Sequence, residues 1–417
     1  MDLIIGAGIS GLSYANFCGH NDYIIIDKEI EIGGYCKTIR QDGFTWDYSG
    51  HFFHFRNKKI KEYLLTEMQG QEILNVEKNT QIYYKNQYID FPFQKNIHQL
   101  EKQDFIDCLY DLFENNFQDE STFKKMLYTK FGKSIADKFL IPYNEKIYAC
   151  DLNDLDANAM GRFFPYANKE EIIKNFRNPE NTSYNTHFTY PKGGAIEYVN
   201  SLFKRVDSSK VFLGEKLISV DLINKIATTN KREIKYDKLI SSTPFPYLMN
   251  LCSLDYDKTI YSWNKVLVFN LGFNKKGIDK TNHWVYFPEK KYSFYRIGYY
   301  DNIFDDDRLS LYVELGFDKN ELVCQEDYLP IILADLKKAN IITDHELISY
   351  ANILMDPAYV HVNEDSENDK IKKMNYLESK HIYSIGRYGD WKYCSIEDNI
   401  IEAKDLAKKL SNNYKNE

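Results

Sequence analysis

The sequence predicts an α/β protein built from more than one domain, and three observations carry this prediction. A glycine-rich turn near the start of the chain follows a short apolar run and precedes a helical pattern. Residues 96–148 show helical spacing amid many charges, whereas residues 262–360 contain alternating, strand-like runs. The length of 417 residues favours two or three interlocked domains over a single one.

The start of the chain has the pattern of a βαβ unit. Leu3 to Ile5 form a short apolar run, and the stretch Gly6 to Gly11 follows at once. Leu12 to Cys18 have helical spacing, and Tyr23 to Ile26 read as a second buried strand. This order of strand, glycine-rich turn, helix and strand predicts a Rossmann-type dinucleotide-binding fold.

The glycines in this turn have defined physical tasks. Gly6 allows the tight turn, Gly8 lets the backbone approach a pyrophosphate, and Gly11 lets the helix pack closely on the strand. The free N–H groups at the helix start favour an anion there. Asp27 ends the second strand, at the distance expected of the acidic residue that holds an adenosine ribose. The alternative is a glycine-rich turn in an unrelated α/β protein, which does not account for this complete context.

The residues after Asp27 favour FAD over NAD, which uses the same fold. Asp27 and Lys28 precede the pair Gly33-Gly34, with the spacing of the second phosphate-proximal loop in amine-oxidase-like FAD proteins. Near the other end, Gly386-Arg387 follows an expected strand and precedes a helical pattern. In those proteins a late glycine at a helix start closes over the flavin. Val220 is a further expected cofactor contact.

Composition and charge speak against several classes of protein. The net charge of -8 gives no support for nucleic-acid binding. The seven cysteines form no CxxC pair, which argues against a zinc site or a disulfide scaffold and fits a reducing cytoplasm. No apolar run is long enough to span a bilayer, and the first apolar stretch reads as a strand and turn rather than a signal peptide.

In order along the chain, further segments resemble UDP-galactopyranose mutase, one branch of the same FAD superfamily. These segments are Tyr48 to His54, Tyr83 to Gln94, Pro142 to Tyr148, Leu155 to Arg162, Tyr190 to Gly194, Tyr295-Arg296, Pro357 to Tyr359 and Gly386 to Tyr393. Pro142 to Tyr148, for example, is similar to the family's Gly-Tyr-Thr-Glu-Lys-Gln-Trp run. The order and spacing of the segments carry the resemblance.

The resemblance implies a flavin-dependent isomerase that interconverts the pyranose and furanose forms of a UDP-linked sugar, similar to UDP-galactose, for surface polysaccharide synthesis. In that family the reduced flavin attacks the anomeric carbon through N5, UDP leaves, and no net redox change follows. FAD must therefore be reduced first, and NAD(P)H is one candidate for the external reductant. No nucleic acid and no membrane span is expected, the location is cytoplasmic, and a homodimer is one open option for the oligomeric state.

The resemblance also assigns roles to individual residues. The catalytic set is Arg162, Arg296, His51, Tyr359 and Tyr393. The substrate-binding set adds Gln94, Phe139, Tyr143, Tyr148 and Tyr184 to Arg162, Arg296, Tyr359 and Tyr393. The two arginines are expected to clamp the diphosphate, because a guanidinium matches phosphate oxygens in a bidentate geometry. His51 and His54 are expected near the isoalloxazine, and no carboxylate or thiol pattern supports a metal beside them.

Three departures from the family pattern leave the sugar and the base open. Gln94 stands where the family has Asn, Tyr148 where it has Trp, and Ser395 where it has Asp. All three fall around the expected nucleotide and sugar rather than around FAD. The alternative function is a true FAD-dependent oxidoreductase of the amine-oxidase or protoporphyrinogen-oxidase type. An arginine pair at a diphosphate would distinguish a mutase from such an oxidase, which needs an aromatic or apolar cage.

The sequence gives the following expected division. Residues 1–95, 191–260 and 361–417 form a discontinuous Rossmann-type FAD-binding domain, 96–165 a helical domain, 166–190 a mobile loop or insertion, and 261–360 an antiparallel-sheet substrate domain. The active site is expected at the junction of these parts.

Overall fold

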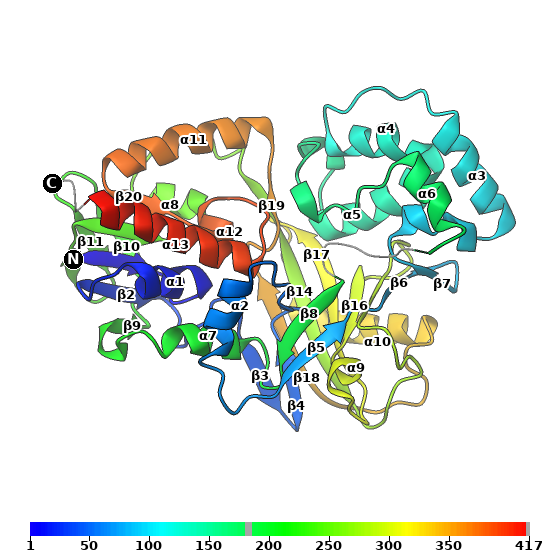
Figure 1. The fold of residues 1–417 in the computed structure, drawn as a ribbon, viewed down its shortest axis with the longest axis horizontal. Helices are drawn as coiled ribbons and strands as arrows, with labels where there is room; N and C mark the ends of the chain where they lie inside the picture. Colours follow the sequence, from blue (N-terminus) through cyan, green and yellow to red (C-terminus); the bar gives the residue numbers. More distant parts are fainter. Residues whose placement is uncertain (180–185, 414–417) are drawn as a thin grey trace.

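A five-stranded parallel sheet forms one half of the molecule (Figure 1), in a computed structural model that describes residues 1–179 and 186–413. Its strands, in spatial order, are β20 (Ile382–Ser384), β13 (Lys238–Ser241), β1 (Asp2–Ile5), β2 (Tyr23–Asp27) and β9 (Val211–Leu213). Leu3 and Ile4 are fully buried, because both faces of this sheet are covered. The Rossmann-type α/β prediction is confirmed.

Helices and a small sheet cover the two faces of the parallel sheet and give three layers. Ile4 and Ile25 pack with α1 (Ile9–Phe17), α2 (Lys58–Leu65), α7 (Ile196–Phe203) and α13 (Ile396–Asn413). Leu3 and Ile26 pack on the opposite side with α8 (Phe245–Leu251), α11 (Glu364–Ser379) and a small antiparallel sheet. That sheet consists of β10 (Leu217–Asp221), β11 (Ile226–Thr229) and β12 (Glu233–Lys235).

A large, mainly antiparallel sheet forms the centre of the molecule (Figure 1). Its order is β18 (Leu347–Met355), β14 (Ser262–Phe273), β17 (Ser310–Asp318), β16 (Arg296–Tyr299), β15 (Trp284–Tyr286), β6 (Thr80–Tyr84) and β7 (Gln87–Asp90), and β19 (Val360–His361) also pairs with β14. β15 and β6 are parallel. One face packs on α10 (Tyr328–Lys338) through residues such as Leu267 and Ile332. α9 (Tyr300–Phe304) follows β16 directly.

The helical part lies at the far end of the large sheet from the parallel sheet (Figure 1). It contains α3 (Lys102–Phe113), α4 (Phe123–Ile135), a π-helix (Ala136–Leu140), α5 (Ile141–Tyr148) and α6 (Lys169–Asn175). Phe131 and Leu127 are fully buried where α4 packs on its neighbours. Two further antiparallel strand pairs connect the parts described above. They are β3 (Thr38–Gln41) with β4 (Phe44–Asp47), and β5 (Ile73–Glu77) with β8 (His187–Pro191).

The structure divides the chain differently from the sequence expectation at two places. β6 and β7 fall within the expected first segment 1–95, but they pair with β15 and so belong to the large sheet. The segment 166–190, expected to be a mobile loop or insertion, contains α6 and β8 among its described residues. Asn168 and Glu171 form a capping box that starts α6, which satisfies the first N–H groups of the helix.

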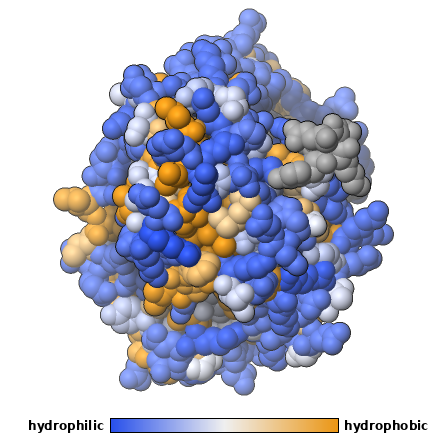
Figure 2. All heavy atoms as spheres, turned by 90° about the vertical axis from the view of Figure 1, so that its left-hand side faces the viewer, coloured by the Kyte–Doolittle hydropathy of each residue, from blue (hydrophilic) through white to orange (hydrophobic). Residues whose placement is uncertain are grey.

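Among the described residues, no helix has the length and apolar character needed to cross a membrane. Figure 2 views the end of the molecule that carries the parallel sheet and the N-terminus. This face is mainly hydrophilic, and hydrophobic residues gather in a band near its centre.

Candidate functional site

A cavity of about 1190 Å³ runs from the glycine-rich turn after β1 to the large sheet and α5. Gly6 and Gly8 line one end, and Tyr143 and Arg296 line the other. The segment 48–54 and α12 (Gly386–Gly389) line the cavity between these ends. The cavity therefore reaches from the dinucleotide-binding half of the molecule to the large sheet, and its volume leaves room for a second molecule beside a dinucleotide.

The glycine-rich turn is shaped for an anion at the start of α1. Gly8 occupies the N-cap position without a side-chain cap, so the first N–H groups of α1 are left for a ligand. Gly11 lies against the turn, and a Cβ there would come within 1.9 Å of the Gly6 carbonyl oxygen. The Ala7 N–H donates to Asp27 Oδ2 at 2.7 Å, so the carboxylate braces the turn as well as ending β2.

The second loop beside the cavity is the Gly33-Gly34 pair, which lies against Gly8. Both glycines have positive φ, at 117° and 58°, a backbone that other residues rarely adopt. The Gly33 N–H donates to the Ala7 carbonyl at 2.9 Å and holds the two loops together. Lys28 also lines the cavity. Val220, expected at the cofactor, instead lies in the core on β10, and residues 215–218 line the cavity there.

Arg387 is a partly buried cation without a carboxylate partner among the described residues. Gly386 precedes it with φ 87°, and the Arg387 N–H donates to Asn399 Oδ1 at 2.7 Å, which fixes the backbone at the start of α12. The guanidinium lies over the rings of Tyr393 at 4.6 Å and Tyr359 at 5.2 Å, and its Nε has no hydrogen-bond partner. A guanidinium whose buried Nε has no partner favours an anion in the cavity.

Arg296, which is partly exposed, and the buried Glu314 form an ion pair across neighbouring strands. Arg296 begins β16 and lies opposite Glu314 on β17. Arg296 Nε and Nη2 donate to the two Glu314 carboxylate oxygens at 2.6 Å and 2.9 Å, and the Ser49 hydroxyl donates to the same carboxylate. Burial opposes the charge on Arg296, but Glu314 raises the pKa of Arg296 well above its usual value. This ion pair uses Nε and Nη2 of Arg296, so Nη1 of Arg296 is left to donate to a ligand.

Arg162 lines the same cavity but is held more loosely. Its Nη2 donates to Asp398 Oδ2 at 2.5 Å, and its side chain remains 34% exposed. The guanidinium also lies 4.5 Å from the Phe163 ring centroid. The structure thus brings both sequence-predicted arginines to one cavity, each already paired with a carboxylate.

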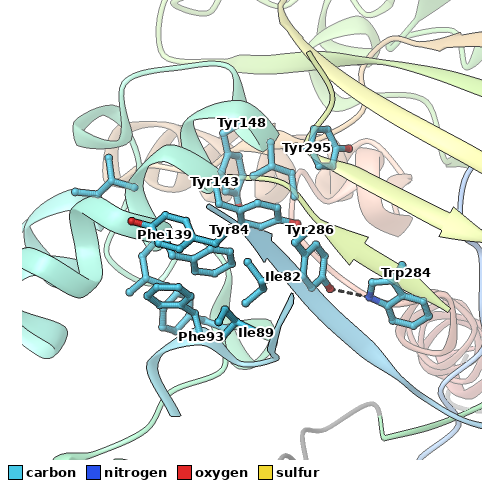
Figure 3. Packing of buried hydrophobic residues seen from close by; sticks show 14 of the residues in the cluster. Ile82, Tyr84, Ile89, Phe93, Phe139, Tyr143, Tyr148, Trp284, Tyr286 and Tyr295 are labelled. Atoms are coloured by element: carbon cyan, nitrogen blue, oxygen red, sulfur yellow. Dashed lines mark hydrogen bonds between the residues drawn. The ribbon is translucent and has the colours of Figure 1, made fainter. Parts of the chain in front are cut away.

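Aromatic rings fill the wall around these arginines, as Figure 3 shows for the cluster beside α5. Tyr359 and Tyr393 stack at 5.8 Å, and Tyr143 stacks on Phe139 at 5.2 Å. All four line the cavity. Burial raises the pKa of Tyr359 and of Tyr143, so both phenols stay protonated and can donate a hydrogen bond.

Three residues expected to bind substrate are placed elsewhere or lie outside the description. Tyr148 is buried beside Tyr359, outside the cavity lining. Gln94 is fully buried, and its Nε2 donates to the Pro165 carbonyl rather than facing the cavity. Tyr184 lies outside the described residues.

The two expected histidines line the cavity on the segment after β4. Burial lowers the pKa of His51 to about 4 and that of His54 to about 4, so both rings are neutral near pH 7. His51 Nδ1 is buried without a partner, whereas His54 Nδ1 lies 3.0 Å from the His187 carbonyl oxygen. Among the described residues, no group of three or more His, Cys, Asp or Glu side chains could hold a metal ion.

Several cavity residues are not apparent from the sequence. Glu314, Tyr286, Tyr295 and Tyr312 line the chamber beside Arg296. Tyr286 lies on β15, Tyr295 directly precedes β16, and Tyr312 and Glu314 lie on β17, so the register of the large sheet brings them together. The one available signal was the adjacency of Tyr295 to Arg296.

Comparison with known proteins agrees with this geometry. Residues 4–66 match the family described as NAD(P)-binding Rossmann-like domain. A crystal structure of reduced UDP-galactopyranose mutase matches with a TM-score of 0.90 and 24% sequence identity, over 98% of this chain and 93% of that chain. The chain has the fold of UDP-galactopyranose mutase.

Two oxidases are also similar to the chain. A structure assigned as a protoporphyrinogen oxidase from Exiguobacterium sp. 255-15 gives a TM-score of 0.78 at 14% identity, over 98% of each chain. Coproporphyrinogen III oxidase of Staphylococcus aureus is 23% identical over 322 residues, which are 67% of this chain and 68% of that protein. Proteins with this fold therefore include both a mutase and oxidases, so the fold alone does not assign the reaction. The residues of the site are needed to choose between the two.

Proposed function

We propose that the cavity binds FAD and that the chain is a non-redox, flavin-dependent nucleotide-sugar mutase. The residues present fit FAD. The uncapped start of α1 and the Gly33-Gly34 loop suit its pyrophosphate, Asp27 would hold its adenosine ribose, and Arg387, which has no carboxylate partner among the described residues, would supply a cation. The neutral His51, with a free ring nitrogen, lies in the segment that would face the isoalloxazine.

The mutase proposal rests on one observation: several arginines and tyrosines line the same part of the cavity. This part, the chamber beside Arg296, lies in the same cavity as the glycine-rich loops that would bind the cofactor. Arg162, Arg296 and Arg387 all line the cavity, together with Tyr359 and Tyr393. Guanidinium groups and phenol donors are suited to a diphosphate, whose leaving-group charge they would stabilise. The substrate would be a UDP-linked sugar similar to UDP-galactose, and the product would serve surface polysaccharide synthesis in the cytoplasm.

FAD, when bound and reduced, would supply the nucleophile for the sugar's anomeric carbon. The chain's own residues would bind and orient the substrate. Arg296 would hold the diphosphate with its free Nη1, while Glu314 fixes the guanidinium plane. The hydroxyls of Tyr359 and Tyr393 would donate hydrogen bonds, and the aromatic wall would keep water from the reacting carbon. NAD(P)H is the candidate for the external reductant.

A second candidate is an FAD-dependent oxidoreductase of the amine-oxidase or protoporphyrinogen-oxidase type. The observation that favours it is that Arg162 and Arg296 are both neutralised by carboxylates. With those charges balanced, the chamber beside Phe139 and Tyr143 is a largely aromatic cage. Such a cage suits an apolar or amine substrate rather than a diphosphate.

The discriminating experiment is a titration of the flavin absorbance and fluorescence with UDP and with UDP-galactose, in the oxidised and the reduced protein. The mutase proposal expects tighter binding to the reduced protein and a furanose product without electron consumption. If no uridine nucleotide binds in either state, the mutase proposal fails. Flavin reduction by an amine or a porphyrinogen would then establish the second candidate.

A further inference from the structure

Tyr286 places a phenol in the chamber whose orientation is set by a neighbouring indole. Trp284 and Tyr286 both lie on β15, and Trp284 Nε1 donates to the Tyr286 hydroxyl oxygen at 2.8 Å (Figure 3). An indole N–H can only donate, so the phenol oxygen is the acceptor and its own O–H must point elsewhere. No acceptor for that O–H is found among the described residues, and Tyr286 lines the cavity.

The surroundings of the pair hold both rings in place. The Trp284 ring stacks on Phe52 at 5.5 Å with 4° between the planes. The Tyr286 ring packs against Phe91 at 5.2 Å and edge-on against Tyr143 at 5.1 Å. β15 itself is paired on both sides, by β16 and by β6. The phenol therefore has little rotational freedom before any ligand arrives.

Arg296 is the direct cross-strand neighbour of Tyr286. The register of β15 and β16 pairs these two residues, so their side chains emerge on the same face of the sheet. Burial raises the pKa of Tyr286, which keeps the phenol protonated, and the nearby Arg296 cation opposes that rise. The free Arg296 Nη1 and the Tyr286 hydroxyl, side by side, give two donors for an anionic oxygen.

We propose that Tyr286 is a ligand-binding residue whose hydroxyl donates to an oxygen of the diphosphate held by Arg296, and that Trp284 is its positioning residue. This proposal rests on the proposed nucleotide-sugar function. It adds a donor that strengthens binding of the nucleotide portion, shared by UDP and UDP-galactose. Trp284 contributes by occupying the phenol's lone pair, which turns the O–H toward the ligand.

The test uses the flavin-loaded, full-length protein and four variants. Tyr286→Phe removes only the hydroxyl, and it should weaken UDP and UDP-galactose by the same factor, about tenfold, because the lost hydrogen bond goes to a charged acceptor. The matched control is Tyr299→Phe on β16. Tyr299 is also buried with a partnerless hydroxyl, but it packs in the core on the other face of the sheet. Its substitution should leave UDP affinity unchanged.

The positioning role is tested by a double-mutant cycle. Trp284→Phe should weaken UDP binding several-fold in the wild-type background and have no further effect in the Tyr286→Phe background. An undiminished effect of Trp284→Phe in that background would overturn the positioning role. Unchanged UDP affinity in Tyr286→Phe, or a loss confined to UDP-galactose, would overturn the diphosphate contact while leaving the proposed function intact. Failure of the wild-type protein to bind UDP would overturn both.

Discussion

Replacing Arg296 by methionine should cost the protein stability and ligand affinity for two separable reasons. Arg296 makes two charge-assisted hydrogen bonds to Glu314, at 2.6 Å and 2.9 Å. Glu314 is only 1% exposed, and the Ser49 hydroxyl is its other partner. Without Arg296 a buried carboxylate is left without a cation, which typically costs about 3–5 kcal/mol. The ligand loses a guanidinium contact as well, which contributes about 1.5–3 kcal/mol.

A second substitution separates the two costs. Glu314→Gln, added to Arg296→Met, removes the uncompensated charge while preserving a side chain that can accept from Ser49. We expect most of the lost stability to return in the double variant. UDP affinity should stay at least about tenfold below that of the wild-type protein, because the glutamine replaces no cation.

The pH dependence of the free energy of unfolding gives a further test of the Arg296→Met variant. A buried carboxyl without a cation favours its protonated form, so the folded Arg296→Met protein should bind a proton that the unfolded chain releases near neutral pH. Its stability deficit should therefore grow as pH rises from about 5 to 8. The double variant has no such carboxyl and should show no added pH dependence.

Urea denaturation followed by tryptophan fluorescence measures the stability terms, and flavin-monitored titration with UDP measures affinity. Recovery of wild-type UDP affinity in the double variant would refute the assignment of Arg296 as a ligand cation. An Arg296→Met protein as stable as the wild type would refute the argument that the pair is buried and coupled.

Three other predictions follow from the site and its supports. Gly11→Ala should destabilise the protein by about 1–3 kcal/mol and lower its flavin content, because the added Cβ meets the Gly6 carbonyl oxygen at 1.9 Å. A variant with the melting temperature and the flavin content of the wild-type protein would contradict this prediction. Arg387→Met should weaken FAD binding at least about tenfold in a flavin-release assay, since its guanidinium has no carboxylate partner among the described residues; full retention would exclude Arg387 from the cofactor site. Burial raises the pKa of Asp47 to about 6, so its contribution to stability falls as pH rises from about 4 to 6, and Asp47→Asn should flatten that slope in urea denaturation.

The nucleotide-binding half was predictable because its signals are local. The apolar run before Gly6, the glycine spacing and Asp27 all lie within one βαβ unit, where sequence neighbours are spatial neighbours. β1 and β2 form within a residue of their expected bounds, and α1 begins three residues earlier than expected, at Ile9. The later strands β13 and β20 join this sheet through long-range pairing.

The residues of the chamber beside Arg296 could be predicted only in part, because the register between strands cannot be inferred from the local sequence. Arg296 was found through its adjacency to Tyr295, but its partner Glu314 lies 18 residues away on another strand. Tyr286 likewise reaches Arg296 only through the pairing of β15 with β16. Spacing matched to a family also misplaces residues where packing differs, as for Gln94, which bonds to the Pro165 carbonyl instead of lining the cavity.

The two paired arginines differ in how readily each can change partner, and this difference bears on which ligand the chamber accepts. Arg162 and Asp398 are 34% and 31% exposed, so exchanging that carboxylate for a phosphate costs little. Glu314 is buried and would be left without a cation if Arg296 moved away, so Arg296 can serve a ligand only with its free Nη1.

In the proposed mutase a diphosphate would therefore draw Arg162 away from Asp398, while Arg296 keeps its place. A neutral substrate would leave the exposed pair intact. UDP binding should accordingly weaken as salt rises, because the partner exchange takes place between partly exposed charges. The salt dependence of UDP binding thus tests the partner exchange at Arg162 independently of any measurement of turnover, and UDP binding that is insensitive to salt would refute it.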